Sequence, residues 1–268
     1  MTEARENWID LSGKTSVVTG ASGGLGVALV WEMAALGAAV AMVDLRTDGL
    51  VSLGEEIGQA GGRAEAFSCD VSDEESVSAV AGEIERAFGP CDILINNAAV
   101  LRPGNLDALP LADWKRLLDV NLTGYLLCAQ TFGKAMLERK SGSIVHVASI
   151  AGSQPQAYSG AYSPSKAAVI MLSRQFAFEW GPHGVRSNVV SPGLVRTPLS
   201  EDFYRDPATL EKREAVVPNR RIGRPEDIAN TAAFLASNRA GYINGQEIIV
   251  DGGFSQTLMS HIPRPGYD

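Results

Sequence analysis

Tyr162 and Lys166 stand four residues apart in the stretch AYSPSK (161–166). Four residues make about one helical turn, so the two side chains share a face if the stretch is helical. Pro164 lies between them, and proline suits only the first turn of a helix, where its missing N–H costs nothing. The spacing therefore predicts that the pair stands at the start of a helix.

A phenol beside an ammonium group is a candidate proton carrier. A free tyrosine has a pKa of about 10 and is a poor acid or base at neutral pH. A cation within a few ångströms favours the phenolate and lowers that pKa. The same spacing is also common on ordinary helices, so the pair alone leaves both interpretations open.

The elements that must position this pair alternate along the chain. We expect strands at 15–20, 38–44, 63–70, 91–99, 142–149, 184–193 and 245–253. Helical patterns lie at 25–36, 72–88, 111–139 and 162–180, and a further one follows the second strand and ends at about residue 60. The strands are apolar nearly throughout, which is typical of a parallel sheet covered on both faces. The alternation predicts an α/β fold with a doubly wound sheet.

The 268 residues show no linker, repeat or low-complexity tract, so we expect one domain over 1–268. The segment 194–224 is rich in prolines and charges and lacks a strand pattern, which favours a substrate lid or binding loop. The tail 255–268 follows the last strand, and its two prolines argue against a helix there. It either frays or reaches a neighbouring subunit.

Composition excludes several classes of function. The chain has 23 basic and 31 acidic residues, and nucleic-acid binding would need a basic face. Cys69, Cys91 and Cys128 are scattered without a C-x-x-C pair or a histidine cluster, so we expect buried thiols in a reducing compartment and no metal site. Neither a secretory signal nor a membrane span is evident. We expect a soluble cytoplasmic protein with no membrane or nucleic-acid partner.

A glycine-rich stretch, TGASGGLG (19–26), joins the first strand to the first helix. Glycine permits positive φ and close approach of a backbone to an anion, and the helix start presents N–H groups to a pyrophosphate. Gly20, Gly24 and Gly26 follow the spacing G-x-x-x-G-x-G and not the common G-x-G-x-x-G. By itself the loop is equally consistent with a tight structural turn.

Asp44 ends the second strand, 18 residues after Gly26. A carboxylate there would accept hydrogen bonds from both hydroxyls of an adenosine ribose and would repel a 2′-phosphate. Position 23 in the loop is glycine, and Arg46 is the one basic residue close to Asp44 in the sequence. The pattern predicts NAD in preference to NADP. The alternative is that Asp44 only caps a turn.

Together these motifs resemble the short-chain dehydrogenase/reductase family from about Leu11 to Gly253. The resemblance implies a Rossmann fold with seven parallel strands in the order 3-2-1-4-5-6-7. NNAA (96–99) resembles the family's NNAG stretch, with Ala99 as the departure, and SPGLVRT (191–197) resembles the segment that closes over the nicotinamide. The implied cofactor contacts are Gly20, Ser22, Gly24, Leu25, Gly26, Asp44, Leu45, Asp70, Val71, Asn97, Ala98, Tyr162, Lys166, Pro192, Gly193, Val195 and Thr197.

The resemblance also implies a catalytic set of Asn121, Ser149, Tyr162 and Lys166. Tyr162 would be the base in oxidation and the acid in reduction, and Lys166 would lower its pKa and hold the nicotinamide ribose. Ser149 would stabilise charge on the substrate oxygen, and Asn121 would hold a water that relays the proton. Read from the residues alone, Asn121 looks like a helix-surface amide, and His146 looks like a core residue of its strand.

We therefore expect an oxidoreductase that transfers a hydride between an alcohol or carbonyl and a nicotinamide cofactor. Expected substrate contacts are Ser149, Tyr162, Gln156 and Leu194, joined by residues 151–156 and 198–217. Their polar side chains favour a sugar, polyol or small hydroxy acid, unless they are only solvated loop residues. The alternatives are an NADPH-dependent reductase of 3-oxoacyl thioesters and a non-catalytic cofactor sensor or scaffold. The apolar faces of 111–139 and of the helix after Tyr162 favour a homotetramer or homodimer.

Overall fold

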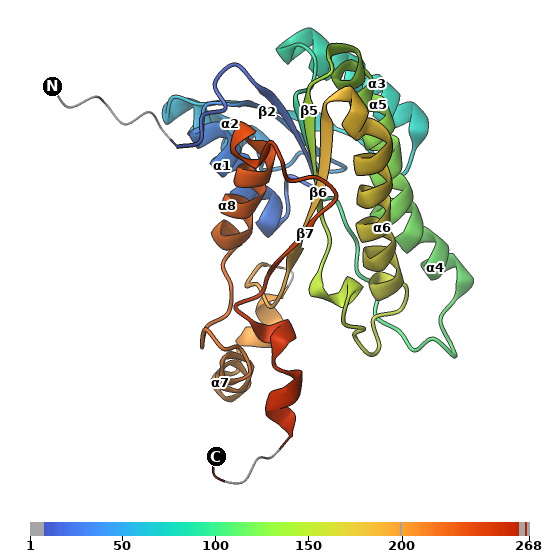
Figure 1. Cartoon of the computed structure of the whole chain (residues 1–268), viewed down its shortest axis with the longest axis vertical. Coiled ribbons are helices and arrows are strands. Elements are labelled where there is room, and N and C mark those ends of the chain that lie inside the picture. The colour runs from blue at the N-terminus through green and yellow to red at the C-terminus, as the bar shows by residue number, and fades with distance from the viewer. Residues whose placement is uncertain (1–7, 199, 263–265, 267–268) are drawn as a thin grey trace, which may run out of the picture.

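The computed structural model describes residues 8–198, 200–262 and 266. Seven parallel strands form one sheet in the order β3-β2-β1-β4-β5-β6-β7, which confirms the predicted topology (Figure 1). The strands are β1 (Thr15–Thr19), β2 (Ala39–Asp44), β3 (Arg63–Ser68), β4 (Ile93–Asn96), β5 (Gly142–Val147), β6 (Val185–Pro192) and β7 (Glu247–Val250).

Helices cover both faces of the sheet (Figure 1). One face packs against α1 (Gly24–Ala35), α2 (Leu50–Gln59) and α8 (Pro225–Ala236), and the other against α3 (Glu74–Phe88), α5 (Gly124–Arg139) and α6 (Tyr162–Trp180). The first layer buries Leu29 and Met33 completely, and the second buries Ile84 and Met136. Burial of each such side chain stabilises the fold by about 2 kcal/mol. No described helix is long and apolar enough to cross a membrane.

The carboxyl ends of the strands meet at one edge of the sheet, because all seven strands are parallel. The chain winds outward in one direction from β1 to β3 and in the other from β4 to β7. The loops after β1 and β4 therefore diverge at the centre of the sheet, and ligands of open α/β sheets bind at such a switch point.

The fourth strand ends earlier than predicted, at Asn96 instead of residue 99. The backbone N–H groups of Asn97 and Ala98 both donate to Oγ1 of Thr19, at 3.0 and 3.1 Å, instead of continuing the ladder. The NNAA stretch thus ties the end of β4 to the end of β1, and the exposed Ala99 side chain is accommodated.

The predicted helical segment 111–139 is divided in three. It contains α4 (Leu111–Leu118), a π-helical turn (Asp119–Thr123) and α5. Single π turns inside α-helices are frequent at functional sites because the extra residue redirects side chains. Asn121 lies in this turn and is completely buried.

The segment 194–224 is less irregular than its composition indicates. It contains a 3₁₀ turn (Glu201–Tyr204) and α7 (Pro207–Ala215). Asp206 caps α7 by accepting the Thr209 N–H at 3.0 Å, and Pro207 occupies the first turn. Both are regular helix-start signals.

The prediction that the tail lacks helix is wrong for its first part. Two 3₁₀ turns, Phe254–Gln256 and Leu258–His261, follow β7 and lie with α7 at the lower end of Figure 1. The Asp251 carboxylate accepts the N–H groups of Gly253 and Ser255 at 2.8 and 2.6 Å, which turns the chain into the first of them. The two prolines of the tail lie outside the described residues.

Candidate active site

Tyr162 is the first residue of α6, and Pro164 lies in its first turn, as the sequence predicts. Lys166 follows one turn later, with its Nζ 5.7 Å from the centre of the Tyr162 ring. Tyr162 is half-buried, whereas Lys166 is only 1% exposed. The structure therefore brings the phenol and the ammonium together at the carboxyl edge of the sheet.

The Lys166 ammonium has two partners behind Tyr162. It donates to the Val147 carbonyl oxygen at 2.8 Å and to the Tyr125 hydroxyl at 3.4 Å. Tyr125 in turn donates its hydroxyl proton to the same carbonyl at 3.0 Å. Sequence reasoning missed Tyr125, because only the packing of α5 against the sheet places it beside a lysine 41 positions away.

Ser149 lies two residues after β5 in an extended conformation and caps a 3₁₀ turn. Its Oγ accepts the Ala151 N–H at 3.1 Å, and its side chain lies close enough to the Tyr162 hydroxyl to lower the pKa of that phenol. A serine and a phenol that contact each other can both reach one oxygen atom of a small ligand. This geometry fits the role that the family resemblance implies for the pair.

Asn121 is buried and links two segments of the chain by hydrogen bonds, so it is not a surface amide. Its Oδ1 accepts the Val100 N–H at 2.8 Å, and its Nδ2 donates to the Val100 carbonyl at 3.0 Å and to Ser165 Oγ at 3.4 Å. The side chain thus fixes the loop after β4 against α6.

Burial shifts the pKa values of the pair toward their neutral forms. It lowers the pKa of Lys166 to about 7. It also raises the pKa of Tyr162, and the hydrogen bond with Ser149 offsets only part of that rise. Desolvation thus outweighs any lowering of the Tyr162 pKa by Lys166, whose ammonium lies over the ring and bonds deeper in the protein. Additional positive charge at this edge would favour the phenolate.

His146 is a core residue, as predicted. Its ring stacks between Tyr125 and Phe176 with centroid distances of 5.8 and 6.0 Å. Burial, followed by the charge of Lys166, lowers the pKa of His146 to about 3. The imidazole is thus neutral at physiological pH and is not a base for this site.

The glycine loop has the geometry of an anion cradle. Gly20 has φ +66°, and a Cβ there would lie 2.7 Å from the Ala98 Cα. A Cβ on Gly26 would lie 2.1 Å from the Gly20 carbonyl oxygen. The start of α1 has no side-chain cap and no acidic residue in its first turn. Its N–H groups and dipole therefore fit a phosphate group.

The segment after β6 reaches this loop. A Cβ on Gly24 would lie 2.6 Å from Pro198 and 3.0 Å from Thr197, so the segment packs directly on the start of α1. The Thr197 N–H donates to Ser200 Oγ at 2.9 Å, and Arg196 pairs through its backbone with Gly223. The end of the SPGLVRT stretch thus lies against the start of α1.

Asp44 faces the glycine loop from the end of β2. Its Oδ2 accepts the backbone N–H and the hydroxyl of Ser22 at 3.0 and 2.8 Å, and its Oδ1 accepts the Arg46 N–H at 3.2 Å. The residue does cap a turn, which was the alternative interpretation. A carboxylate can accept about four hydrogen bonds, so these three leave capacity for a ribose hydroxyl.

The other predicted cofactor residues lie at the same edge with structural partners of their own. Asp70 accepts hydrogen bonds from Ser72 and pairs with Arg116 at 3.4 Å. Asn97 donates its side-chain amide to the carbonyls of Thr19 and Gly20 at 3.1 and 3.0 Å. The remaining members lie at or after the ends of β1, β2, β3, β4 and β6: Leu25, Leu45, Val71, Ala98, Pro192, Gly193 and Val195.

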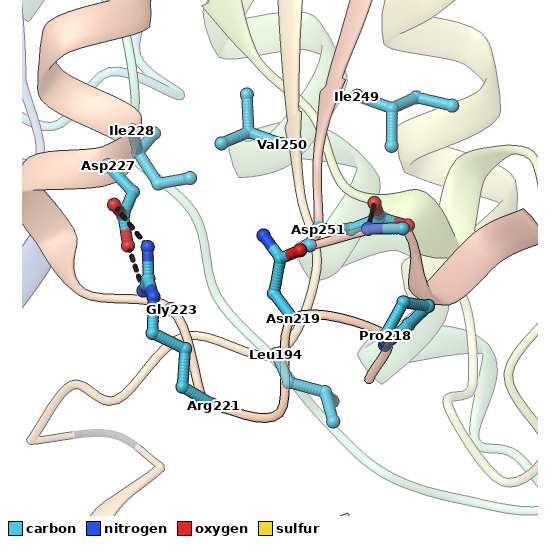
Figure 2. A pocket seen from close by; sticks show the side chains of 12 residues that line it. Leu194, Pro218, Asn219, Arg221, Gly223, Asp227, Ile228, Ile249, Val250 and Asp251 are labelled. Atoms are coloured by element: carbon cyan, nitrogen blue, oxygen red, sulfur yellow. Dashed lines mark hydrogen bonds and ion pairs between the residues drawn. The ribbon is translucent and has the colours of Figure 1, made fainter. Parts of the chain in front are cut away.

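The predicted substrate residues are less well grouped. Leu194 lines a cavity of about 460 Å³ between β7 and α8 (Figure 2), and Ser149, Tyr162 and Gln156 are not among its lining residues. An Arg221–Asp227 ion pair with N–O distances of 2.6 and 2.9 Å closes one side of that cavity.

The charged residues of 198–217 make surface ion pairs with their own neighbours. Glu201 pairs with Arg196, and Asp202 pairs with Arg205. Tyr204 is buried, beneath the guanidinium of Arg213. The charges of Glu201 and Asp202 are therefore partnered within this segment, as the solvated-loop alternative would have it.

A second loop that sequence reasoning missed borders Tyr162. Gly104 and residues 158–160 form a short parallel bridge, in which the Gly104 N–H donates to the Tyr158 carbonyl at 3.0 Å. Tyr158 has φ +59°, which is unusual for a side chain of this size, and is exposed. The loop after β4 thereby forms a wall beside the start of α6.

Comparison with known proteins agrees with this geometry. A family model described as Enoyl-(Acyl carrier protein) reductase matches residues 20–255. The chain is 39% identical to D-threitol dehydrogenase of Mycolicibacterium smegmatis, over 95% of this chain and 99% of the relative. It is 36% identical to 2,3-dihydro-2,3-dihydroxybenzoate dehydrogenase of Bacillus subtilis, over 91% and 96%.

Solved structures show the same similarity. The gluconate 5-dehydrogenase of Burkholderia cenocepacia, in complex with NADP and tartrate, superimposes with a TM-score of 0.88 at 30% identity, over 93% of this chain and 98% of that one. The chain therefore belongs to the short-chain dehydrogenase/reductase family. Its relatives are named as dehydrogenases of alcohols, which supports oxidoreductase activity.

Proposed function

We propose that this protein oxidises a secondary alcohol of a polyol, sugar acid or small hydroxy acid, and reduces the corresponding carbonyl, with NAD as its preferred cofactor. The observation that carries the proposal is the Tyr162 phenol, with the Ser149 side chain beside it and Lys166 behind it, near an uncapped helix start that fits a phosphate. The names of the relatives support polyols and sugar acids as the substrate class.

Each residue of the site has its own role in the proposed reaction. A bound nicotinamide would supply the acceptor for the hydride that leaves the carbinol carbon. Tyr162 takes the hydroxyl proton, and Ser149 donates a hydrogen bond to the oxygen on which charge develops. Lys166 stabilises the phenolate by its charge. Asn121 holds the loop after β4 against α6 and so keeps this wall of the site in place.

A panel of substrates tests the proposal. Polyols, sugar acids, hydroxy acids and a 3-oxoacyl thioester are assayed with NAD(H) and NADP(H) by absorbance of the reduced cofactor. We expect turnover of at least one polyol or hydroxy acid with NAD. Turnover confined to the thioester with NADPH would favour the reductase alternative. Dinucleotide binding without turnover of any substrate would favour a sensor.

Asp44→Ala tests the cofactor preference. The carboxylate at the end of β2 would repel a 2′-phosphate, and its loss also frees the N–H and hydroxyl of Ser22. We expect the ratio of kcat/KM for NAD over NADP to fall by about tenfold, which is the effect of a lost interaction of about 1.4 kcal/mol. Asp48→Ala, four positions further along and exposed, is the control. An unchanged ratio would show that Asp44 does not select the cofactor.

We also propose that the chain acts as one domain and that 194–224 is a lid over the site. The contact of Thr197 and Pro198 with Gly24 supports the lid. Met171 and Phe178 are exposed on α6, and such an apolar face supports assembly into a homodimer or homotetramer.

A further inference from the structure

The surroundings of Lys166 contain a group that the proposed mechanism does not use. The ammonium is almost entirely buried, and none of the described ion pairs involves it. Its hydrogen-bond acceptors are the Val147 carbonyl and the Tyr125 hydroxyl oxygen. A buried cation without a counterion depends on such acceptors to offset the loss of hydration.

The hydroxyl of Tyr125 is oriented to act as an acceptor. A phenol has one proton, and Tyr125 donates it to the Val147 carbonyl at 3.0 Å. Its oxygen lone pairs are therefore free to receive the Lys166 N–H at 3.4 Å. The ring face adds to this attraction, because Lys166 Nζ also lies 5.2 Å from the Tyr125 ring centre.

Tyr125 is itself held in place from two other elements. The side-chain amide of Asn96, at the end of β4, donates to the Tyr125 backbone carbonyl at 3.1 Å. The ring of His146, on β5, stacks on the Tyr125 ring. Tyr125 is also the second residue after the π turn that carries Asn121. A residue so fixed can set the position of a flexible lysine side chain.

We propose that Tyr125 is a positioning residue that holds the Lys166 ammonium in its charged form and in place behind Tyr162. This inference rests on the role assigned to Lys166 in the proposed function. The titratable groups that face Lys166 are Tyr125 from α5, His146 from β5 and Tyr162 from α6. Burial keeps Tyr125 and His146 uncharged, so neither supplies a counterion for the Lys166 ammonium.

Tyr125→Phe tests the proposal, because it keeps the ring and removes only the hydroxyl. The chain has six lysines, so isotope-labelled lysine gives a simple NMR spectrum in which Lys166→Met assigns the Lys166 signal. We expect the pKa of Lys166, followed by NMR, to fall by about one unit in Tyr125→Phe, as loss of a hydrogen bond to a charged group would give. An unchanged Lys166 titration in folded Tyr125→Phe would overturn the proposal.

Ser173→Ala is the matched control, since Ser173 is a buried hydroxyl on the same helix, bonded to Ser187 at 2.9 Å. It should leave the Lys166 titration unchanged, and an equal shift there would mean that any loss of packing around α6 moves Lys166. Reduced-cofactor affinity gives a second readout. Tyr125→Phe should weaken it by about threefold at pH 7 in the parent chain but not in a Lys166→Met background. A further loss in that background would contradict action through Lys166.

The lysine titration needs no substrate. It therefore reports on Tyr125 even if every alcohol in the panel proves inert, and the failure of one proposal is distinguishable from the failure of the other.

Discussion

Tyr162→Phe is expected to lower kcat by about 10³-fold or more, which corresponds to about 4 kcal/mol of lost transition-state stabilisation. The substitution keeps the ring at the start of α6 and removes only the atom that exchanges a proton with the alcohol. The Ser149 hydroxyl remains, but a serine hydroxyl is a weak base unless an adjacent base activates it.

Cofactor binding separates this result from a general loss of structure. The affinity for the reduced dinucleotide, measured by fluorescence titration, should stay within about threefold of the parent, because the glycine loop and Asp44 are untouched. Tyr242→Phe, at a fully exposed tyrosine after α8, is the matched control and should leave kcat unchanged. If Tyr162→Phe retained the parent kcat, Tyr162 would not be the proton carrier.

Much of the fold was predictable because strands and loops are encoded locally. Apolar β-branched runs mark buried parallel strands, and Gly20, Gly24 and Gly26 mark a turn where neighbouring atoms pack too closely for a Cβ. The position of Asp44 follows from the end of β2. The spacing of Tyr162 and Lys166, with Pro164 between them, predicted the start of a helix, and α6 begins at Tyr162.

Features that depend on packing between distant segments were not predictable. Tyr125 reaches Lys166 only because α5 and α6 cover the same face of the sheet. Asn121 is buried because a π turn interrupts a helical pattern that otherwise looks continuous. The early end of β4 depends on Thr19, 78 residues away. None of these leaves a periodic signal in the sequence.

The direction in which the Tyr162 pKa shifts could not be predicted from the sequence either, since it depends on how much water surrounds each group. Residue spacing gives the distance between two charges but not their burial, and in this site desolvation is the larger effect. In contrast, α7 carries regular start signals in Asp206 and Pro207 and could have been recognised in the sequence.

Lys166→Met should impair both cofactor binding and turnover. The unbranched methionine keeps most of the buried stem, so the main loss is the charge. We expect reduced-cofactor affinity to fall by about tenfold and kcat by about 10²-fold, because Tyr162 would lose the cation that favours its phenolate. Lys134→Met, at an exposed position of α5, is the control. A loss of affinity with unchanged kcat would contradict a role for Lys166 in tuning Tyr162.

The role of Lys166 in cofactor binding also predicts how dinucleotide affinity changes with pH. Burial lowers the pKa of Lys166 to about 7, so the ammonium is present below that pH and is neutralised above it. Dinucleotide affinity of the parent should therefore decrease as pH rises through about 7, whereas affinity of Lys166→Met should stay constant across the same range. Fluorescence titrations at pH 6 and pH 9 decide the matter, because His146 with its pKa of about 3 does not titrate between them. A parallel decrease in both proteins would assign the titration to a group other than Lys166.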